Sequence, residues 1–287
     1  MNAPLRPRAL AKRPRRWLRR RVWSRFGASV IGRPLMPSLL GFQKVGSGVV
    51  DGLGDLRLAY DPRSDIGQTL FVSGTFEEFE IRFFEQILSG IERPTVFDIG
   101  ANLGLHCLRW ARSSIGASIY AFEPSPRTLR TLRRNIQMNR LEQRVEVIPV
   151  ALSDHSGTSA FFHCEDDAYS SLRDTHRRRV VESIEVEVTT VDTFVKARGL
   201  PSLNLMKIDV EGLEREVLQG SSRTLELLRP HLFVEVFGGT HSNPDPEGTI
   251  EFVRTFGYEA FVLKNGVPEK YVRHSDQFYN YYFLPKS

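Results

Sequence analysis

The sequence predicts an α/β fold in which a mostly parallel sheet carries helices on both faces. From residue 95 onward, short apolar segments alternate with segments of helical character. This alternation is typical of a parallel sheet that is buried on both faces. A turn with two glycines joins the first of these apolar segments to the next helix. The composition, 41% hydrophobic and 25% charged, supplies enough apolar material for a sizeable core.

The 287 residues allow one large domain or two small ones, and we expect one domain over residues 43–287. Its Rossmann-like core, residues 93–287, is interrupted by a β-rich insertion at 155–190. The core is predicted to run in this order: strand 95–99, helix 102–113, strand 117–122, helix 126–139, strand 144–150, the insertion, strand 203–208, helix 213–228, strand 231–237, helix 247–256, and two final strands, YEAFVL and NYYFLP.

A small cap of strands and one helix is predicted before the core, over residues 43–92. Residues 43–73 contain short apolar segments separated by glycines, including QTLFVSG, and we expect strands there. The segment TFEEFEIRFFEQIL predicts an amphipathic helix. Thr75 can cap this helix, and Glu78 follows three residues later, as in a capping box.

The positive charge of the chain is concentrated in an N-terminal arm, residues 1–42. The formal net charge is +5, yet no Asp or Glu precedes Asp51, and the first fifty residues carry twelve Lys or Arg. Without those twelve the net charge is −7, so the body is mildly acidic. The arm suits an anionic membrane surface, RNA or a mitochondrial presequence, and a disordered basic tail explains it equally well.

Several classes of protein are disfavoured by what the sequence lacks. Two cysteines, Cys107 and Cys164, make no disulfide framework, so we expect a reducing, cytoplasmic location, with peripheral membrane contact through the arm as an option. No C-x-x-C or H-E-x-x-H spacing occurs, and we predict no metal. No run of eighteen apolar residues is present, so no transmembrane segment is expected.

The turn in "TVFDIGANLG" indicates which cofactor the fold can hold. Nicotinamide enzymes use G-x-G-x-x-G, but Asn102 stands between Gly100 and Gly104 where that fingerprint has its middle glycine. Asp98, just before the turn, would repel a pyrophosphate and suits a cationic amine or sulfonium. The pattern therefore favours S-adenosylmethionine over NAD, and a strand-to-helix turn without any ligand remains an alternative.

Two further acids follow strands and complete the predicted cofactor site. Glu123 comes 19 residues after Gly104, close to the roughly 20 expected for the acid that binds ribose hydroxyls. Asp154, in "ALSDHSG", can accept a hydrogen bond from an adenine amino group, although an ordinary turn aspartate is an equal alternative.

Catalytic groups are expected after the later strands. Asp209 follows a buried strand, where a charge needs a partner or a function, so we predict that it is the catalytic base. Glu211 would orient the acceptor or hold a cation, with His241 and Glu235 in reserve. The side chains expected to contact the acceptor are Ser170 and Ser171 of the insertion, Lys207 and Glu235.

Taken together, the motifs resemble one known family. VFDIGANLG, YAFEPSP, VALSDHSG, SSL, VTTVDTF, LMKIDVEGLEREVLQG and NYYFLP occur in order over residues 70–285 and are similar to those of FkbM-type S-adenosylmethionine-dependent methyltransferases. The resemblance implies a class I methyltransferase fold with seven strands, the last antiparallel, and methyl transfer to an oxygen. It maps the family's motif residues onto Asp98, Gly100, Asn102, Gly104, Glu123, Asp154, Lys207, Asp209, Glu211 and Gly212. The basic arm is not explained by the family.

The expected function is thus O-methylation of a hydroxyl on a sugar, glycan or other small natural product, with S-adenosylmethionine as cofactor. Two alternatives remain: an RNA methyltransferase that uses the basic arm as a phosphate grip, and a non-catalytic binding protein on the same fold. An NAD oxidoreductase is disfavoured by Asp98 and by the missing glycine.

Overall fold

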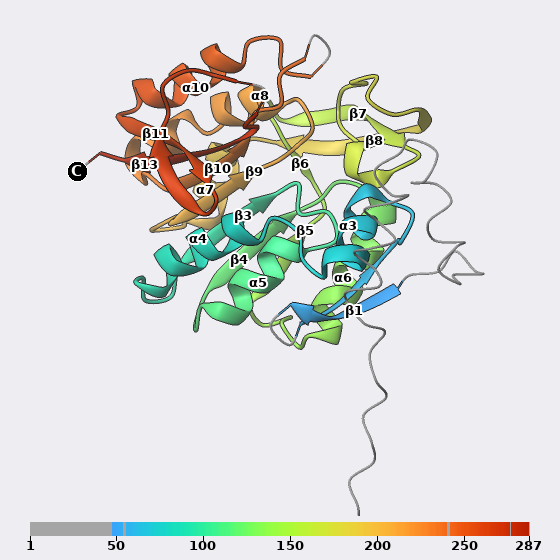
Figure 1. Ribbon diagram of the computed structural model, residues 1–287. Coiled ribbons are helices and arrows are strands. Elements are labelled where there is room, and N and C mark those ends of the chain that lie inside the picture. Colours follow the sequence, from blue (N-terminus) through green and yellow to red (C-terminus); the bar gives the residue numbers. More distant parts are fainter. Residues whose placement is uncertain (1–47, 54–55, 240–241, 276, 287) are drawn as a thin grey trace, which may run out of the picture.

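The computed structural model describes residues 48–53, 56–239, 242–275 and 277–286. The basic arm of residues 1–42 lies outside them, as does His241. The described chain begins with a hairpin of β1 (Gly48–Leu53) and β2 (Leu56–Tyr60), which pair antiparallel. A central sheet and a smaller sheet of three strands follow (Figure 1).

The central sheet has eight strands in the order β12-β11-β13-β10-β9-β3-β4-β5. The five strands from β10 to β5 are parallel, and β13 runs antiparallel between β10 and β11. The bounds are β3 Thr95–Ile99, β4 Ser118–Phe122, β5 Val145–Ile148, β9 Leu205–Ile208, β10 His231–Glu235, β11 Tyr258–Lys264, β12 Val267–Lys270 and β13 Asn280–Pro285.

The eighth strand is the difference from the predicted seven. β12 pairs with β11 at the sheet edge, across a turn in which Asn265 and Gly266 both have positive φ, as a two-residue hairpin turn requires. All four residues of β12 are exposed. It buries no apolar face, so the hydrophobic pattern does not reveal it, and only the Asn-Gly pair indicates a hairpin.

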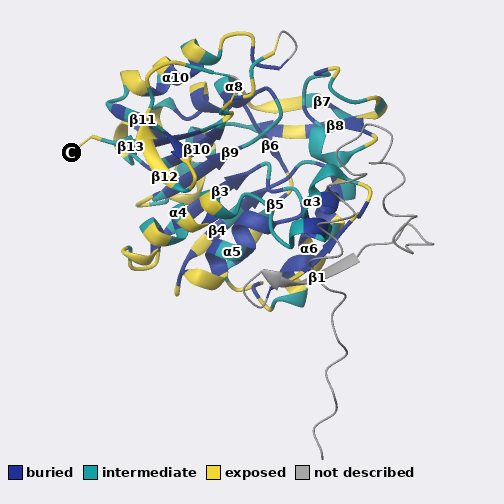
Figure 2. Ribbon diagram, viewed as in Figure 1, coloured by how far each residue is buried: buried dark blue, intermediate teal, exposed yellow. Residues whose placement is uncertain are grey.

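Helices cover both faces of the sheet, as predicted. One face packs against α4 (Glu78–Ser89), α5 (Leu105–Ser113) and α6 (Pro126–Met138), and the other against α7 (Val191–Arg198), α8 (Glu214–Gln219), α9 (Ser222–Leu227) and α10 (Pro246–Thr255). Successive residues of a strand point to opposite faces, so Val96 joins the first core and Phe97 the second. Burial is concentrated in the central strands (Figure 2).

Two helix predictions need correction in this region. The predicted helix 213–228 is two helices, α8 and α9, which are separated at Gly220. A Cβ on Gly220 would lie 2.0 Å from the Ser153 carbonyl oxygen, so the chain bends there against another loop. The α7 helix was not predicted at all, although Thr190 caps it by accepting a hydrogen bond from the backbone N–H of Thr193.

The cap contains a helix where strands were predicted. QTLFVSG lies in α3 (Asp65–Ser73), so its assignment to a strand was wrong. Ser64 accepts a hydrogen bond from the backbone N–H of Gly67, and Gly74 ends the helix with φ 74°, which are normal helix start and stop signals. Thr75 does not cap α4; its hydroxyl instead donates to the Glu78 carboxylate at 2.6 Å.

The insertion is a long hairpin that forms its own sheet. β7 (Gly157–Cys164) pairs antiparallel with β8 (Val180–Thr189), which also pairs parallel with β6 (Ala151–Leu152). A single 3₁₀ turn, η2 (Asp167–Tyr169), lies between the two long strands. Among the described helices, none combines the length and apolar character needed to cross a bilayer.

Candidate functional site

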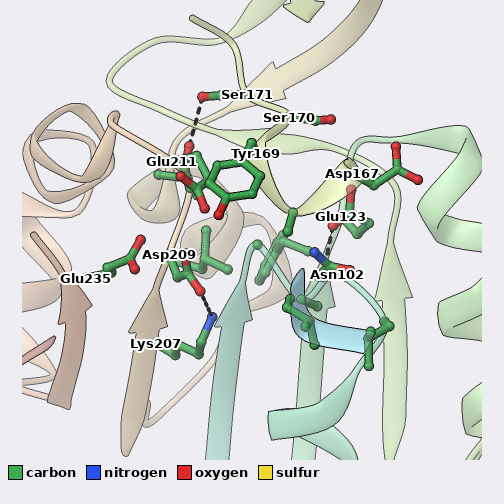
Figure 3. A pocket seen from close by; sticks show the side chains of 18 of the residues that line it. Asn102, Glu123, Asp167, Tyr169, Ser170, Ser171, Lys207, Asp209, Glu211 and Glu235 are labelled. Carbon is green, nitrogen blue, oxygen red and sulfur yellow. Dashed lines mark hydrogen bonds and ion pairs between the residues drawn. The ribbon is translucent and has the colours of Figure 1, made fainter. Parts of the chain in front are cut away.

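A pocket of about 380 Å³ opens at the carboxyl ends of the parallel strands (Figure 3). Ligands of open α/β sheets bind at this edge, and the volume lies in the usual range for small-ligand sites. Nine of the predicted site residues line it: Gly100, Asn102, Glu123, Ser170, Ser171, Lys207, Asp209, Glu211 and Glu235. Asp98, Gly104 and Asp154 do not line it.

The two glycines of the turn serve the packing of the chain on itself. Gly100 has φ 77°, and a Cβ there would lie 1.8 Å from the Asp209 carbonyl oxygen, so glycine lets the turn approach the end of β9. Gly104 has φ 90°, and its Cβ would meet Leu132 Cδ1 of α6 at 2.6 Å. The turn is thus locked between β9 and α6, which fixes the backbone that faces the pocket.

Asn102 and Glu123 connect the turn to the end of β4. The Asn102 backbone N–H donates to Glu123 Oε2 at 2.9 Å, and the Ser125 N–H donates to Oε1 at 2.9 Å. A carboxylate offers about four acceptor positions, so two of them remain for hydroxyl groups in the pocket. Glu123 lies where the spacing predicted a ribose-binding acid, and that role stays a prediction.

We expect cofactor affinity to depend on the ionisation of Glu123. Burial and the neighbouring charges of Asp167 and Asp98 raise the pKa of Glu123 to about 7. The hydrogen bonds from two backbone N–H groups act in the opposite direction and lower it, but they do not outweigh the burial. Hydroxyl donors favour the charged form, so S-adenosylhomocysteine should bind more tightly as the pH rises from about 6 to about 8, by at most tenfold per pH unit. Calorimetric titration measures this, and Glu123→Gln should remove the slope.

Asp98 is fully buried beneath the pocket and does not line it, so its expected contact with a cofactor amine is not supported. Its Oδ2 accepts a hydrogen bond from the Cys107 backbone N–H at 3.0 Å, in the first turn of α5. Its Oδ1 lies 3.7 Å from Lys207 Nζ. The charge of Asp98 therefore acts on the pocket through Lys207, which belongs to β9, the strand between β3 and β10.

Asp154 lies outside the pocket, so the predicted contact with adenine is not supported. Its exposed carboxylate pairs with His155 at 2.8 Å. The wall beyond Glu123 is instead lined by apolar groups, including Leu152 and Phe161.

Glu123→Gln should weaken S-adenosylhomocysteine binding by about 10- to 100-fold, the loss of one or two charge-assisted hydrogen bonds, while the affinity of Asp154→Asn should stay within twofold of wild type. Equal losses in both variants would restore the assignment of Asp154.

Lys207 and Asp209 form a buried ion pair at the end of β9. Lys207 Nζ lies 2.9 Å from Asp209 Oδ2, and Lys207 is 1% exposed. Burial opposes the charged form of Lys207, but Asp209 and Asp98 outweigh it and raise the pKa of Lys207. Burial likewise opposes ionisation of Asp209, yet the Lys207 charge lowers the pKa of that carboxyl below its usual value. Asp209 is therefore ionised at neutral pH.

Two more carboxyl groups, Glu211 and Glu235, face Asp209 across the pocket. Oxygens of the three groups lie within 4.8 Å of one another. Burial and the Asp209 charge raise the pKa of Glu235 well above its usual value, and they raise the pKa of Glu211 to about 8. Such a cluster shares protons. Its spacing would also allow it to ligate a cation, so the absence of a metal stays a prediction.

The β9–α8 turn holds Glu211 in an uncommon backbone conformation. Glu211 has φ 58° and Gly212 has φ 98°. The buried Glu214 carboxylate accepts hydrogen bonds from the Val210 and Gly212 backbone N–H groups, at 3.1 and 3.0 Å. Arg177 of the insertion pairs with the Glu211 carboxylate. The acid is thus fixed from both sides, and neither Glu214 nor Arg177 was singled out in the sequence.

The insertion crosses the pocket and is attached on both sides. Toward α3, the Tyr169 hydroxyl donates to Asp65 Oδ2 at 2.7 Å, and Arg178 pairs with the same oxygen at 2.8 Å. Toward the β9–α8 turn, Arg173 donates to the carbonyl oxygens of Gly212 and Ser242, both at 3.1 Å. The loop is therefore a strap over the site.

Ser170 and Ser171 line the pocket, but their hydroxyls already have partners in the protein. Ser171 Oγ donates to the Val210 carbonyl oxygen at 2.9 Å, and Ser170 Oγ accepts from the Cys164 N–H at 3.0 Å. Both serines hold the strap in place. Their predicted contact with the acceptor remains a prediction.

Comparison with known proteins shows the family to which the chain belongs. Residues 98–260 match the sequence family described as the methyltransferase FkbM domain. The chain belongs to this FkbM family. It is accordingly an S-adenosylmethionine-dependent methyltransferase, which confirms the resemblance, the enzyme class and the cofactor that were expected from the motifs.

Individual FkbM relatives are moderately similar. The "Hexuronic acid methyltransferase AglP" of Haloferax volcanii is 28% identical over 182 residues, which cover 63% of this chain and 70% of the relative. The "2-O-methyltransferase NoeI" of Sinorhizobium fredii is 30% identical, with 52% and 67% covered. A solved methyltransferase FkbM from Methylobacillus flagellatus aligns with a TM-score of 0.46 at 15% identity, over 68% of this chain and 46% of that one. The chain thus spans under half of that solved protein.

The FkbM cofactor fits the chemistry of the pocket. Glu123 offers acceptor positions for ribose hydroxyls, and the walls at Leu152 and Phe161 are apolar, as a purine requires. Ionised Asp209 can face a positive sulfonium or amine. When bound, S-adenosylmethionine supplies an electrophilic methyl group.

Proposed function

We propose that this FkbM methyltransferase methylates a hydroxyl oxygen of a small polyhydroxylated acceptor, a sugar or glycan. The observation that carries the proposal is the cluster of Asp209, Glu211 and Glu235, which lies in the same pocket as the cofactor turn. Ionised carboxylates accept hydrogen bonds from hydroxyls and can remove their protons, and protonated carboxyl groups can donate a hydrogen bond to a hydroxyl oxygen. The printed names of two relatives, a 2-O- and a 31-O-demethyl-FK506 methyltransferase, support transfer to an oxygen, and the name of a third, a hexuronic acid methyltransferase, supports a sugar-type acceptor.

In this mechanism Asp209 takes the proton from the acceptor hydroxyl. Lys207 holds Asp209 ionised and fixes its orientation through their 2.9 Å contact. Glu235, which keeps its proton, donates a hydrogen bond within the cluster. Glu211, held by Arg177, orients a second hydroxyl of the acceptor. Most of the rate comes from holding the hydroxyl in line with the methyl group, and the proton transfer contributes a further factor of about 10²–10⁴.

The other roles expected from the sequence remain subordinate proposals. His241 lies outside the described residues and stays a reserve base. A role for the basic arm at a membrane or on nucleic acid stays a proposal for the same reason, and so does a cytoplasmic location. For an RNA acceptor, the carboxyl groups of the described pocket are unfavourable because they repel phosphates.

Methyl transfer from isotopically labelled S-adenosylmethionine to a panel of glycosides tests the function. Mass spectrometry of the products should locate the label on a hydroxyl oxygen. A matched panel of short RNAs should stay unlabelled. Label on RNA alone, or cofactor binding without transfer to any hydroxyl, would reject the proposal and favour the RNA or the non-catalytic alternative respectively.

A further inference from the structure

Two exposed aromatic side chains stand at the mouth of the pocket beside the carboxyl cluster. Phe237 is 40% exposed and Tyr279 is 47% exposed, and both line the pocket. Their ring centroids lie 6.5 Å apart. Large apolar groups exposed next to a pocket commonly mark a ligand-binding surface.

The backbone of this aromatic pair is joined to the central sheet. Phe237 follows β10 by two residues, and Tyr279 directly precedes β13, which pairs antiparallel with β10. The Val236 backbone N–H donates to the Tyr279 carbonyl oxygen at 2.6 Å. The two rings therefore project from positions just beyond the paired ends of neighbouring strands.

Arg177 fixes the ring of Phe237 without supplying a free positive charge. Its guanidinium carbon lies 4.3 Å from the Phe237 ring centroid and 4.8 Å from that of Tyr169, while its charge pairs with Glu211. Lys207, the other permanently cationic residue among the described pocket lining, pairs with Asp209. Neither cation is available to an anionic ligand.

Acidic groups outnumber those two cations in the described lining. Seven acidic side chains face the pocket: Asp65, Glu77, Glu123, Asp167, Asp209, Glu211 and Glu235. A phosphate or carboxylate placed here would find both cations already paired and would lie near the ionised Asp209. A ring with hydroxyls at its edge and apolar C–H groups on its face matches both parts of the surface, because carboxyl groups bind the hydroxyls and aromatic rings pack on the C–H face.

We propose that Phe237 and Tyr279 form an acceptor platform on which the apolar face of an uncharged sugar ring packs, so that the enzyme selects neutral over anionic acceptors, in contrast to the relative named for a hexuronic acid. The platform rests on the proposed O-methylation and specifies its acceptor. It lies directly beside Glu235, which precedes Phe237 by two residues at the end of β10. A ring on the platform therefore presents its edge hydroxyls to the carboxyl cluster.

Steady-state kinetics with the full chain and two matched probes tests the platform. Methyl glucoside and methyl glucuronide share the ring and the hydroxyls carried directly on it, and they differ at C6, where a carboxylate replaces the hydroxymethyl group. We expect kcat/KM to favour the neutral probe at least about tenfold, for one unfavourable charge contact. Phe237→Ala and Tyr279→Ala should each raise KM for the glucoside about tenfold, with kcat within twofold and cofactor affinity unchanged. Tyr279→Phe keeps the ring and should retain most of the affinity.

The control removes an equally exposed ring elsewhere. Phe79 on α4 is 55% exposed and does not line the pocket, so Phe79→Ala should leave KM unchanged. Unchanged KM in both platform variants, or a preference for the glucuronide, would overturn the platform.

Saturation-transfer NMR of glucoside binding separates the platform from the proposed function. Binding that Phe237→Ala abolishes, without methyl transfer to any acceptor, would reject the function and leave the platform standing. Methyl transfer to a hydroxyl that is unaffected by removal of either ring would reject the platform and leave the proposed function standing.

Discussion

Asp209→Asn is expected to lower kcat by about 10²–10⁴-fold, the range that a positioned general base contributes, while S-adenosylhomocysteine still binds. The amide cannot take the hydroxyl proton, but it keeps the size of the carboxylate and can still accept a hydrogen bond from Lys207, which lies 2.9 Å away in the wild type. Single-turnover kinetics with a saturating glycoside measures the loss, and calorimetry measures cofactor affinity.

The matched control for this variant is Glu269→Gln. It also removes one carboxylate from a Lys–Glu pair, because Glu269 lies 3.7 Å from Lys264, but on the exposed edge hairpin of β11 and β12. Its kcat should equal that of wild type. A kcat for Asp209→Asn within threefold of wild type would exclude Asp209 as the base and direct the search to Glu211 and Glu235, the two acids that face it.

Gly100→Ala is expected to destabilise the protein by about 3–5 kcal/mol, through a steric clash added to backbone strain. The new Cβ would lie 1.8 Å from the Asp209 carbonyl oxygen at a φ of 77°. Relief requires the turn to separate from the end of β9, so the cofactor turn and the proposed base would move apart. Both unfolding midpoint and cofactor binding should therefore fall together, as denaturant unfolding and calorimetry can measure.

Gly199→Ala provides the comparison at the end of α7. Gly199 also has positive φ, 58°, but nothing lies within 4 Å of a Cβ added there. It should cost only about 1 kcal/mol, the strain of a left-handed alanine. If both variants lost similar stability, backbone strain alone would explain Gly100, and the close approach to β9 would not matter.

Much of the sheet could be predicted because parallel strands are buried on both faces. β3 and β13 have the bounds expected from their apolar segments. α3 was mistaken for a strand because its short apolar run suits either structure, and only the cap at Ser64 and the stop at Gly74 distinguish them. A tertiary contact can also interrupt a helix that the amphipathic pattern predicts as continuous. This occurs at Gly220, which packs against the Ser153 backbone between α8 and α9.

The floor of the site was predictable because it lies at strand ends, whose order follows from the fold. Glu123, Lys207, Asp209 and Glu235 are all such residues. Asp98 and Asp154 also lie near the ends of strands, but their side chains do not line the pocket. The direction of a side chain at a strand end depends on the turn that follows, which the sequence pattern does not specify. Residues from loops, such as Arg177 and Tyr279, left no signal because only tertiary packing brings them to the site.

The pocket wall extends beyond the part of the chain that matches the family. The match covers residues 98–260, whereas Asp65, Ile66, Thr69, Phe76, Glu77 and Tyr279 of the lining lie outside it. Cofactor turn and carboxyl cluster thus belong to the shared segment, while α3 and the residue before β13 are contributed by its flanks. One half of the proposed aromatic platform, Tyr279, therefore comes from outside the segment shared with the family, while the other half, Phe237, lies within it.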